Sequence, residues 1–107
     1  MFNIRNEDGY VTVTEGIERK TLSHGEKTLL AEFRLSAGST IPKHSHPHEQ
    51  TGYLVSGKMI MTIGETAHAV SPGDNWCISG DVVHGAEVLE DSVVIEVFAP
   101  VREDFLT

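Results

Sequence analysis

The sequence predicts an all-β protein folded as a sandwich or a barrel. Short apolar or alternating segments recur along its 107 residues with turn residues between them, a spacing typical of these two architectures. Apolar residues nowhere keep the i, i+3, i+4, i+7 pattern for the length of an ordinary helix. A chain of this length can bury one hydrophobic core, so we expect a single domain over residues 1–107.

The predicted strands follow one another along the chain. Residues 11–14 form the first candidate, and residues 28–35 alternate so that Leu29, Phe33 and Leu35 share one face. Two hairpins with turns at Gly57-Lys58 and Gly64-Glu65 are then expected to join three strands: residues 53–56, 59–63 and 67–70. A last strand is predicted over residues 92–99, after turns at Pro72-Gly73-Asp74, Ser79-Gly80-Asp81 and Glu90-Asp91.

Charge and composition exclude several classes of function. The formal net charge of −8 opposes binding to nucleic acid or to anionic membranes. The N-terminus has no apolar run, and no stretch approaches the roughly 20 apolar residues of a membrane span. We therefore expect a soluble, cytoplasmic protein. Its six histidines are unusual in a small acidic chain, and histidine is both a common metal ligand and a frequent acid or base.

Spacing selects a possible metal site from these histidines. His44 and His46 lie two apart, so in an extended segment both rings point to the same side. Pro47 then interrupts the strand, and Gln50 follows just before the next one, where its amide oxygen could be a third ligand. His84, at the start of a later strand, is the best candidate for the fourth. The alternative is that His44 and His46 are solvated surface residues.

The other nearby groups have weaker claims. His48 shares the strand parity of the pair, but Pro47 is expected to turn the chain before it. Glu49 has the opposite parity, which favours a carboxylate that faces solvent or supports the site from outside. His24 and His68 have no matched partners and are interpreted as surface or packing residues.

These positions resemble the motifs of the small single-domain cupins. The first cupin motif is a glycine, His-x-His, a glutamate and a second glycine, and the second motif is a glycine followed by a histidine. The matching residues here are Gly38, His44, His46, Gln50 and Gly57, then Gly73 and His84. The resemblance implies a double-sheet jelly-roll β-barrel that binds a divalent transition metal ion.

Gln50 occupies the position where that motif has glutamate. Three neutral imidazoles and an amide leave a divalent ion with a charge of +2, whereas a carboxylate would leave +1. The more positive centre favours Lewis-acid chemistry on an anion and disfavours oxidation of the metal. Nitrogen and oxygen ligands do not identify the ion, so Zn, Ni, Fe, Mn and Co all stay open. Alternatively, Gln50 only forms hydrogen bonds.

The last predicted strand contains an anomalous carboxylate. Both faces of residues 92–99 are largely apolar, so we expect this strand to be buried on both sides with Glu96 inside. A buried carboxylate needs a partner, a raised pKa or a chemical role. It could form a structural ion pair or open to solvent at the barrel mouth, or it could act as a general acid or base beside the metal.

The C-terminal residues narrow the resemblance to the pectin-degradation cupins of the KdgF type. Those chains carry Asp-x-Phe-x-Pro-x-Arg before an acidic pair and Phe-Leu, and this chain reads Glu96-Val97-Phe98-Ala99-Pro100-Val101-Arg102-Glu103-Asp104-Phe105-Leu106. That family ketonises 4,5-unsaturated uronates. The resemblance implies catalytic roles for Glu96, Phe98 and Arg102, with Arg102 binding the uronate carboxylate.

The sequence as a whole therefore predicts a metal-dependent isomerase or tautomerase that acts on a small carboxylated sugar. Purely structural roles stay open for two of the predicted catalytic residues. Arg102 could pair with an acidic neighbour or with another subunit, and Phe98 could belong to the core. Other chemistries also stay open, namely a metal-dependent dioxygenase or decarboxylase, or a module that only binds a small carboxylate. Sheet edges and the apolar outer face of the last strand predict a homodimer.

Overall fold

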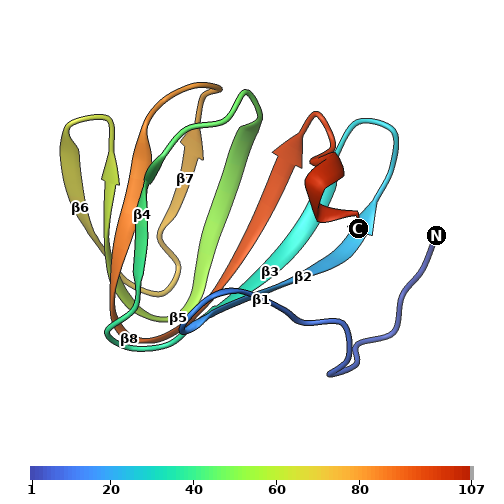
Figure 1. Cartoon of the computed structure of the whole chain (residues 1–107), viewed down its shortest axis with the longest axis horizontal. Coiled ribbons are helices and arrows are strands. Elements are labelled where there is room, and N and C mark those ends of the chain that lie inside the picture. The colour runs from blue at the N-terminus through green and yellow to red at the C-terminus, as the bar shows by residue number, and fades with distance from the viewer. Residues whose placement is uncertain (107) are drawn as a thin grey trace.

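The computed structural model describes residues 1–106, and antiparallel β-strands make up most of it (Figure 1). Among these residues there is no helix long and apolar enough to cross a membrane. The elements are β1 (Val11–Thr14), β2 (Ile17–His24), β3 (Leu29–Leu35), β4 (Thr40–His44), β5 (Glu49–Ile63), β6 (Thr66–Val70), β7 (Asn75–Ile78), β8 (His84–Ala99) and the 3₁₀ turn η1 (Glu103–Phe105).

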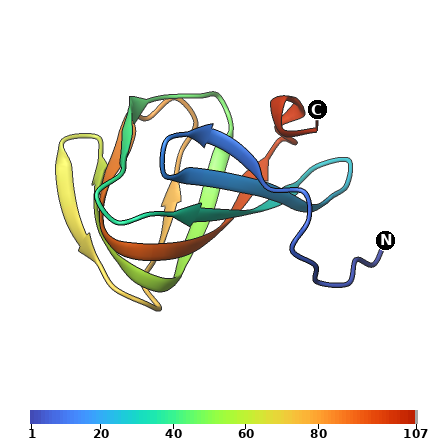
Figure 2. The ribbon, with the colours of Figure 1, turned by 60° about the horizontal axis from the view of Figure 1, so that its bottom comes forward.

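The two longest strands, β5 and β8, organise the sheet. They pair antiparallel from Glu49 opposite Ala99 to Ile63 opposite His84. One end of this ribbon is flanked by β3, β2 and β1 on one side and by β7 on the other, and the opposite end is flanked by β4 and β6. Because both strands curve midway, the eight-stranded sheet folds over itself without closing (Figures 1 and 2). The predicted all-β jelly roll is confirmed.

Two predicted turns are wrong because they fall where the long strands bend. The chain does not reverse at Gly57-Lys58 or at Glu90-Asp91; β5 and β8 continue through these residues with shifts in register. Gly57 has φ of +98°, and a Cβ there would collide with Ser92 and with the backbone of Asp91. Gly57 therefore allows a β-bulge where the two strands approach closely. The turn was predicted wrongly because glycine is typical of both bulges and turns.

The sequence does not predict β2 and β7 as strands. In β2 the charged run Glu18-Arg19-Lys20 follows Ile17, which leaves little alternation to detect. β7 has only four residues. Both strands are defined by long-range pairing, β2 with β3 and β7 with β5, rather than by a local pattern.

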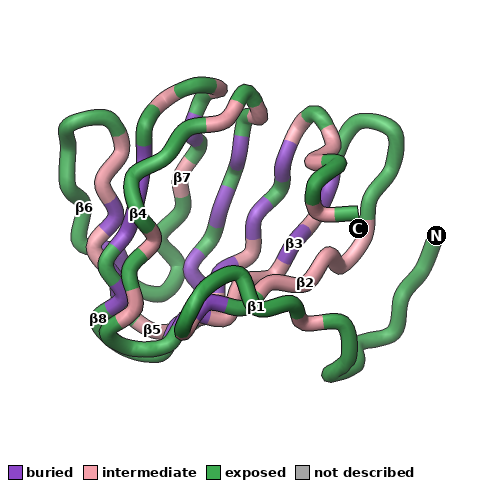
Figure 3. The backbone as a smooth tube through the Cα atoms, in the orientation of Figure 1, coloured by how far each residue is buried: buried purple, intermediate pink, exposed green. Residues whose placement is uncertain are grey.

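The hydrophobic core lies on the inner side of the folded sheet, and Figure 3 marks the buried segments of the backbone in purple. Leu54, Met59 and Val94 are almost wholly buried in its larger cluster, to which both halves of the ribbon contribute. A smaller cluster of Leu29, Ala31 and Phe98 lies beside it. Some residues of both clusters also line a cavity inside the fold.

The last strand is buried on one face only, which corrects the expectation that both sides are covered. The side chains of Val94, Glu96 and Phe98 point inward and are buried. The alternate residues Ile95 and Val97 face outward, and Val97 is 36% exposed. The outer face of β8 at this end of the sheet is therefore apolar.

Candidate functional site

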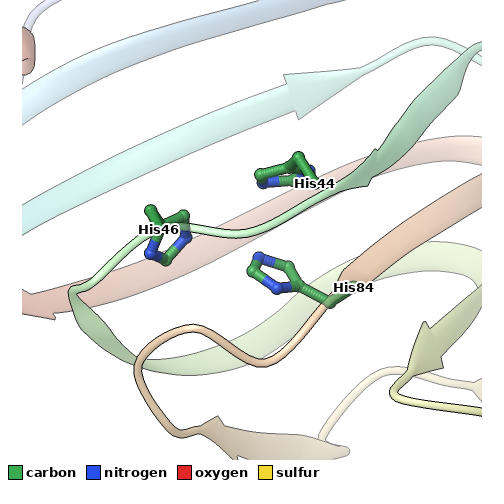
Figure 4. A group of neighbouring side chains, drawn as sticks. All are labelled: His44, His46 and His84. Carbon is green, nitrogen blue, oxygen red and sulfur yellow. The ribbon is translucent and has the colours of Figure 1, made fainter.

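Three histidines from separate parts of the chain meet at one end of the barrel. His44 ends β4, His46 lies in the segment before β5, and His84 begins β8 directly opposite His44. Figure 4 shows the three rings gathered around a common point, and their possible ligand atoms all lie within 4.8 Å of one another. The cluster could hold a metal ion.

Backbone hydrogen bonds orient each ring. Because a carbonyl oxygen can only accept a hydrogen bond, the Nδ1 atom that contacts it must carry the proton, and the neutral ring keeps a lone pair on Nε2. Metal-binding histidines are commonly held in this way. The three Nδ1 donors and their carbonyl acceptors are His44 to Pro42 at 2.8 Å, His46 to His48 at 3.0 Å, and His84 to Val82 at 2.8 Å.

Burial favours the neutral form of the His46 and His84 rings. Desolvation lowers the pKa of both rings, and the nearby Arg102 guanidinium lowers them further. Both rings therefore favour the neutral form that binds metals. The Nε2 atom of His84 is buried without a hydrogen-bond partner, which is costly for a polar atom. A bound metal ion would satisfy it, so the residues present fit such an ion.

Gln50 lies where its amide can join the cluster. It points inward from β5, is 7% exposed, and places its Oε1 2.8 Å from the Nε2 of His46. With Nδ1 of His46 protonated, both of these atoms are acceptors, and they attract one another only if His46 gains a proton or the amide rotates. A cation bound by both atoms satisfies both lone pairs, which supports Gln50 as a ligand.

The predicted catalytic residues line the same cavity as two of the three histidines, and His46 is not among the lining residues. This cavity has a volume of about 370 Å³, within the usual range for small-molecule sites. Other residues do not join the site: His48 lies outside the cluster of three, and Glu49, His24 and His68 are not part of it either. The sequence-predicted residues on its walls are His44, Gln50, His84, Glu96, Phe98 and Arg102.

Glu96 is a buried carboxyl group close to the side chains of Trp76 and Gln50. It is 5% exposed, and its Oε1 accepts a hydrogen bond of 3.3 Å from the indole Nε1–H of Trp76. Its Oε2 is buried without a partner, and none of the ion pairs among residues 1–106 includes Glu96. Burial raises the pKa of Glu96 to about 8, against the opposing effects of Trp76 and Gln50. In the metal-free protein it is therefore largely a neutral acid at pH 7.

Arg102 lines the cavity beside two aromatic rings. Its guanidinium carbon lies 5.1 Å from the ring centre of Phe98 and 4.2 Å from that of Phe105. Asp104 accepts two hydrogen bonds from it, at 3.2 Å from Nε and 2.7 Å from Nη2. The pairing with an acidic neighbour that the sequence left open is therefore present, yet Arg102 still lines the cavity.

Sequence reasoning missed one residue of this site and left the role of a second open. Arg19 lines the cavity from β2, with its guanidinium carbon 4.1 Å from the Phe105 ring centre, and it was missed because β2 itself has no clear alternation. Trp76 contacts Glu96 from β7. From the sequence it could either line the pocket or simply pack, because being the one tryptophan in the chain does not distinguish these two roles.

A known protein family matches the part of the chain that contains the histidine motifs. The family described as "Cupin domain" matches residues 31–99, which cover the histidine cluster, Gln50 and Glu96. The chain belongs to the cupin family. The resemblance based on the two histidine motifs is thereby confirmed.

Relatives of this cupin extend the similarity over nearly the whole chain. It is 28% identical over 105 residues to the pectin degradation protein KdgF of Dickeya dadantii, covering 96% of each chain. KdgF from a Halomonas species is 33% identical, with a TM-score of 0.91 over 97% of this chain and 98% of that one. An RmlC-like cupin from Shewanella frigidimarina has a TM-score of 0.92 at 24% identity, over 97% and 94%, and shows the shared fold.

We predict that His46→Ala and His84→Ala each weaken metal binding by at least about tenfold, since each removes one of the converging Nε2 atoms. Calorimetric titration of the metal-free protein with Zn²⁺ or Ni²⁺ measures the affinity. His24→Ala and His68→Ala are matched controls on exposed histidines and should leave it unchanged. Equal affinity in all four variants would contradict the site.

The raised pKa of Glu96 also predicts how stability depends on pH. The unfolded carboxyl loses its proton near 4.5 and the folded one near 8, so between these values the folded protein binds more protons than the unfolded chain. The free energy of unfolding should therefore fall as pH rises through this window, by up to about 1.4 kcal/mol per pH unit. Urea unfolding of metal-free protein at several pH values measures it. Glu96→Gln should lose this slope, and an identical slope in the variant would refute the prediction.

Proposed function

We propose that this cupin is a metal-dependent isomerase that converts a 4,5-unsaturated uronate to its linear keto form. One observation carries the proposal: a single cavity is lined by two histidines of the candidate metal cluster, by a buried carboxyl group without an ion pair among residues 1–106, and by an arginine. The names of the KdgF relatives support a substrate derived from pectin, and the uronate carboxylate matches the positive charge of the arginine.

The proposed reaction is an isomerisation that balances without a co-reactant. As the C1 hydroxyl of the cyclic sugar loses its proton, the bond between C1 and the ring oxygen breaks, and C1 becomes an aldehyde. The ring oxygen leaves as an enolate on C5. A proton added to C4 then converts the double bond between C4 and C5 into a single bond and makes C5 a ketone. One proton is lost from oxygen and one is gained by carbon. Catalysis is therefore helped by a group that can accept the first proton and donate the second.

The histidine cluster and Gln50 would hold the metal in this proposal. His44, His46 and His84 contribute imidazole nitrogens and Gln50 an amide oxygen to a divalent Zn, Ni, Fe, Mn or Co ion. Such an ion supplies Lewis-acid stabilisation of negative charge on substrate oxygen. Because all four ligands are uncharged, none of them reduces the positive charge available to the substrate.

Glu96 is the proton-transfer group of the proposal. It lies on the cavity wall with one carboxyl oxygen unpaired. Its ionised form, which a cation held in the same cavity would favour, accepts the proton of the C1 hydroxyl as the ring opens. The acid formed in this way then gives its proton to C4 of the sugar. The same residue therefore restores its own protonation state in each turnover, as an isomerisation requires.

Arg102 and Phe98 position the sugar in the proposal. Arg102 donates its remaining N–H groups to the uronate carboxylate while Asp104 holds its Nε side. The buried ring of Phe98 offers an apolar surface beside the histidines, with its centre 5.9 Å from that of His46. Arg19 adds a second positive charge at the cavity wall, which favours entry of an anion into a protein whose net charge is −8.

The variants Glu96→Gln and Arg102→Gln test these roles separately. Loss of the ultraviolet absorbance of the conjugated double bond measures turnover of an unsaturated uronate by metal-loaded protein. We expect Glu96→Gln to lower kcat by about 100-fold or more, because it removes the proton-transfer group. Arg102→Gln should raise KM at least about tenfold.

Glu65→Gln, in the exposed turn after β5, is the matched control and should keep wild-type rates. Wild-type rates in Glu96→Gln would remove the assigned proton-transfer role. Oxygen uptake with a bound carboxylate would identify a dioxygenase instead, and binding without turnover would identify a binding protein.

We further infer that two copies of the chain associate through the outer face of the β3–β8–β5 end of the sheet. There Leu30 lies opposite Val97, Val97 opposite Thr51, and Ile95 opposite Tyr53, so largely apolar side chains form adjacent rows. Tyr53 is 48% exposed in the single chain. Since each copy has a net charge of −8, association needs a surface with few unpaired charges. The charged residues of β3 on this face, Glu32 and Arg34, form an ion pair with one another.

Val97→Glu tests the dimer, because it places a negative charge at the centre of this face. Sedimentation velocity should show a dimer for the wild type and a shift to monomer for the variant. Val11→Glu makes the same change on the exposed strand β1 and should keep the dimer. A dimer lost in Val11→Glu but kept in Val97→Glu would place the interface elsewhere.

A further inference from the structure

The single tryptophan reaches the buried carboxyl group across an intervening strand. Gly52 of β5 pairs with Trp76 of β7 on one side and with Glu96 of β8 on the other. The indole Nε1–H of Trp76 donates to the Oε1 of Glu96 at 3.3 Å. The donor and the acceptor therefore lie two strands apart, and the strand between them contributes no side chain.

Gly52 makes this contact possible. A Cβ on Gly52 would overlap the indole ring of Trp76, at the Nε1, Cε2 and Cζ2 atoms. The indole thus occupies the volume that a side chain at residue 52 would fill. Residue 52 has ordinary strand dihedral angles, so the requirement for glycine here is steric space and not backbone conformation.

The contact distinguishes the two oxygens of the carboxyl group. Oε1 has the indole as its partner, while Oε2 is buried and unpaired. An indole N–H is only a donor and does not exchange its proton with a carboxyl group. In the neutral acid, an N–H donor pairs with the carbonyl oxygen, which leaves the acidic proton on the other oxygen.

We propose that Trp76, in the space that Gly52 leaves open, is a positioning residue that holds Oε1 of Glu96 and so assigns proton transfer to Oε2. This inference rests on the proposed isomerase function. Glutamate has three rotatable side-chain bonds, and restricting them before the substrate arrives removes an entropic cost from the reaction. Trp76 acts through Glu96 and does not itself touch the substrate.

The first test observes the contact in metal-free protein without relying on activity. Because the chain has one tryptophan, a ¹H–¹⁵N spectrum contains a single indole N–H resonance. Glu96→Gln and Gly52→Ala should each shift that resonance by more than its linewidth. Glu65→Gln and Gly25→Ala are the matched controls, since Glu65 is exposed and a Cβ on Gly25 would meet open space. An unmoved resonance in Glu96→Gln would overturn the proposal.

The second test measures kcat and KM on metal-loaded protein with an unsaturated uronate. Trp76→Phe and Gly52→Ala should lower kcat about 10- to 100-fold with little change in KM, because the acid is misplaced while the carboxylate site is intact. Gly25→Ala should keep both values. In a Glu96→Gln background, Trp76→Phe should cause no further loss; an equal loss in both backgrounds would show a merely structural role and overturn the proposal.

The two tests separate this proposal from the proposed function. If wild-type protein turns over the uronate and Trp76→Phe is as fast as wild type, the positioning role is wrong and the isomerase stands. If wild-type protein shows no turnover while Glu96→Gln moves the indole resonance, the isomerase and the positioning role both fail, and only the contact is left. If Trp76→Phe does not fold, Gly52→Ala decides, because it keeps the indole in the chain.

Discussion

The continuous pairing of β5 with β8 is the constraint on which the rest of the structure depends. This ribbon brings Gln50, Phe98 and Glu96 onto one inner wall, because Gln50 lies opposite Phe98 and Gly52 lies opposite Glu96. Its far end starts at His84 and holds His44 beside it through β4. A shift of one residue in this register would turn the whole wall outward, so the hydrophobic core and the site are specified by the same hydrogen-bonded ladder.

The electrostatic character of the cavity differs from that of the chain as a whole. Acidic residues outnumber basic ones two to one in the sequence, yet the cavity is lined by two arginines, by His84, whose lowered pKa favours the neutral ring, and by Glu96, whose raised pKa keeps it largely uncharged in the metal-free protein. Desolvation is the main cause of both pKa shifts. The interior can therefore attract an anion although the surface repels anions at longer range, where salt screens the repulsion.

Local patterns predicted much of this molecule, and long-range register determined what they missed. The histidine pair could be recognised because residues two apart in an extended segment share a side, and Glu96 stood out because its neighbours are apolar. Gly57 was misread because the same residue suits a turn and a bulge. Arg19 could not be found, since it lies on a strand without alternation. The contact of Trp76 with Glu96 could not be predicted either, because it depends on pairings that join β7, β5 and β8.

The hydrogen bonds that orient the three histidines are all short-range in sequence, each to a carbonyl oxygen two residues away. The direction of each imidazole is therefore set mainly by its own segment. On the β5–β8 wall, Gln50 contacts a histidine through its amide oxygen, whereas the hydrogen bond of Glu96 is made with Trp76. Evolution can therefore alter Glu96 while the histidines keep their orientation, which gives a physical reason why one scaffold can acquire new chemistry through few substitutions.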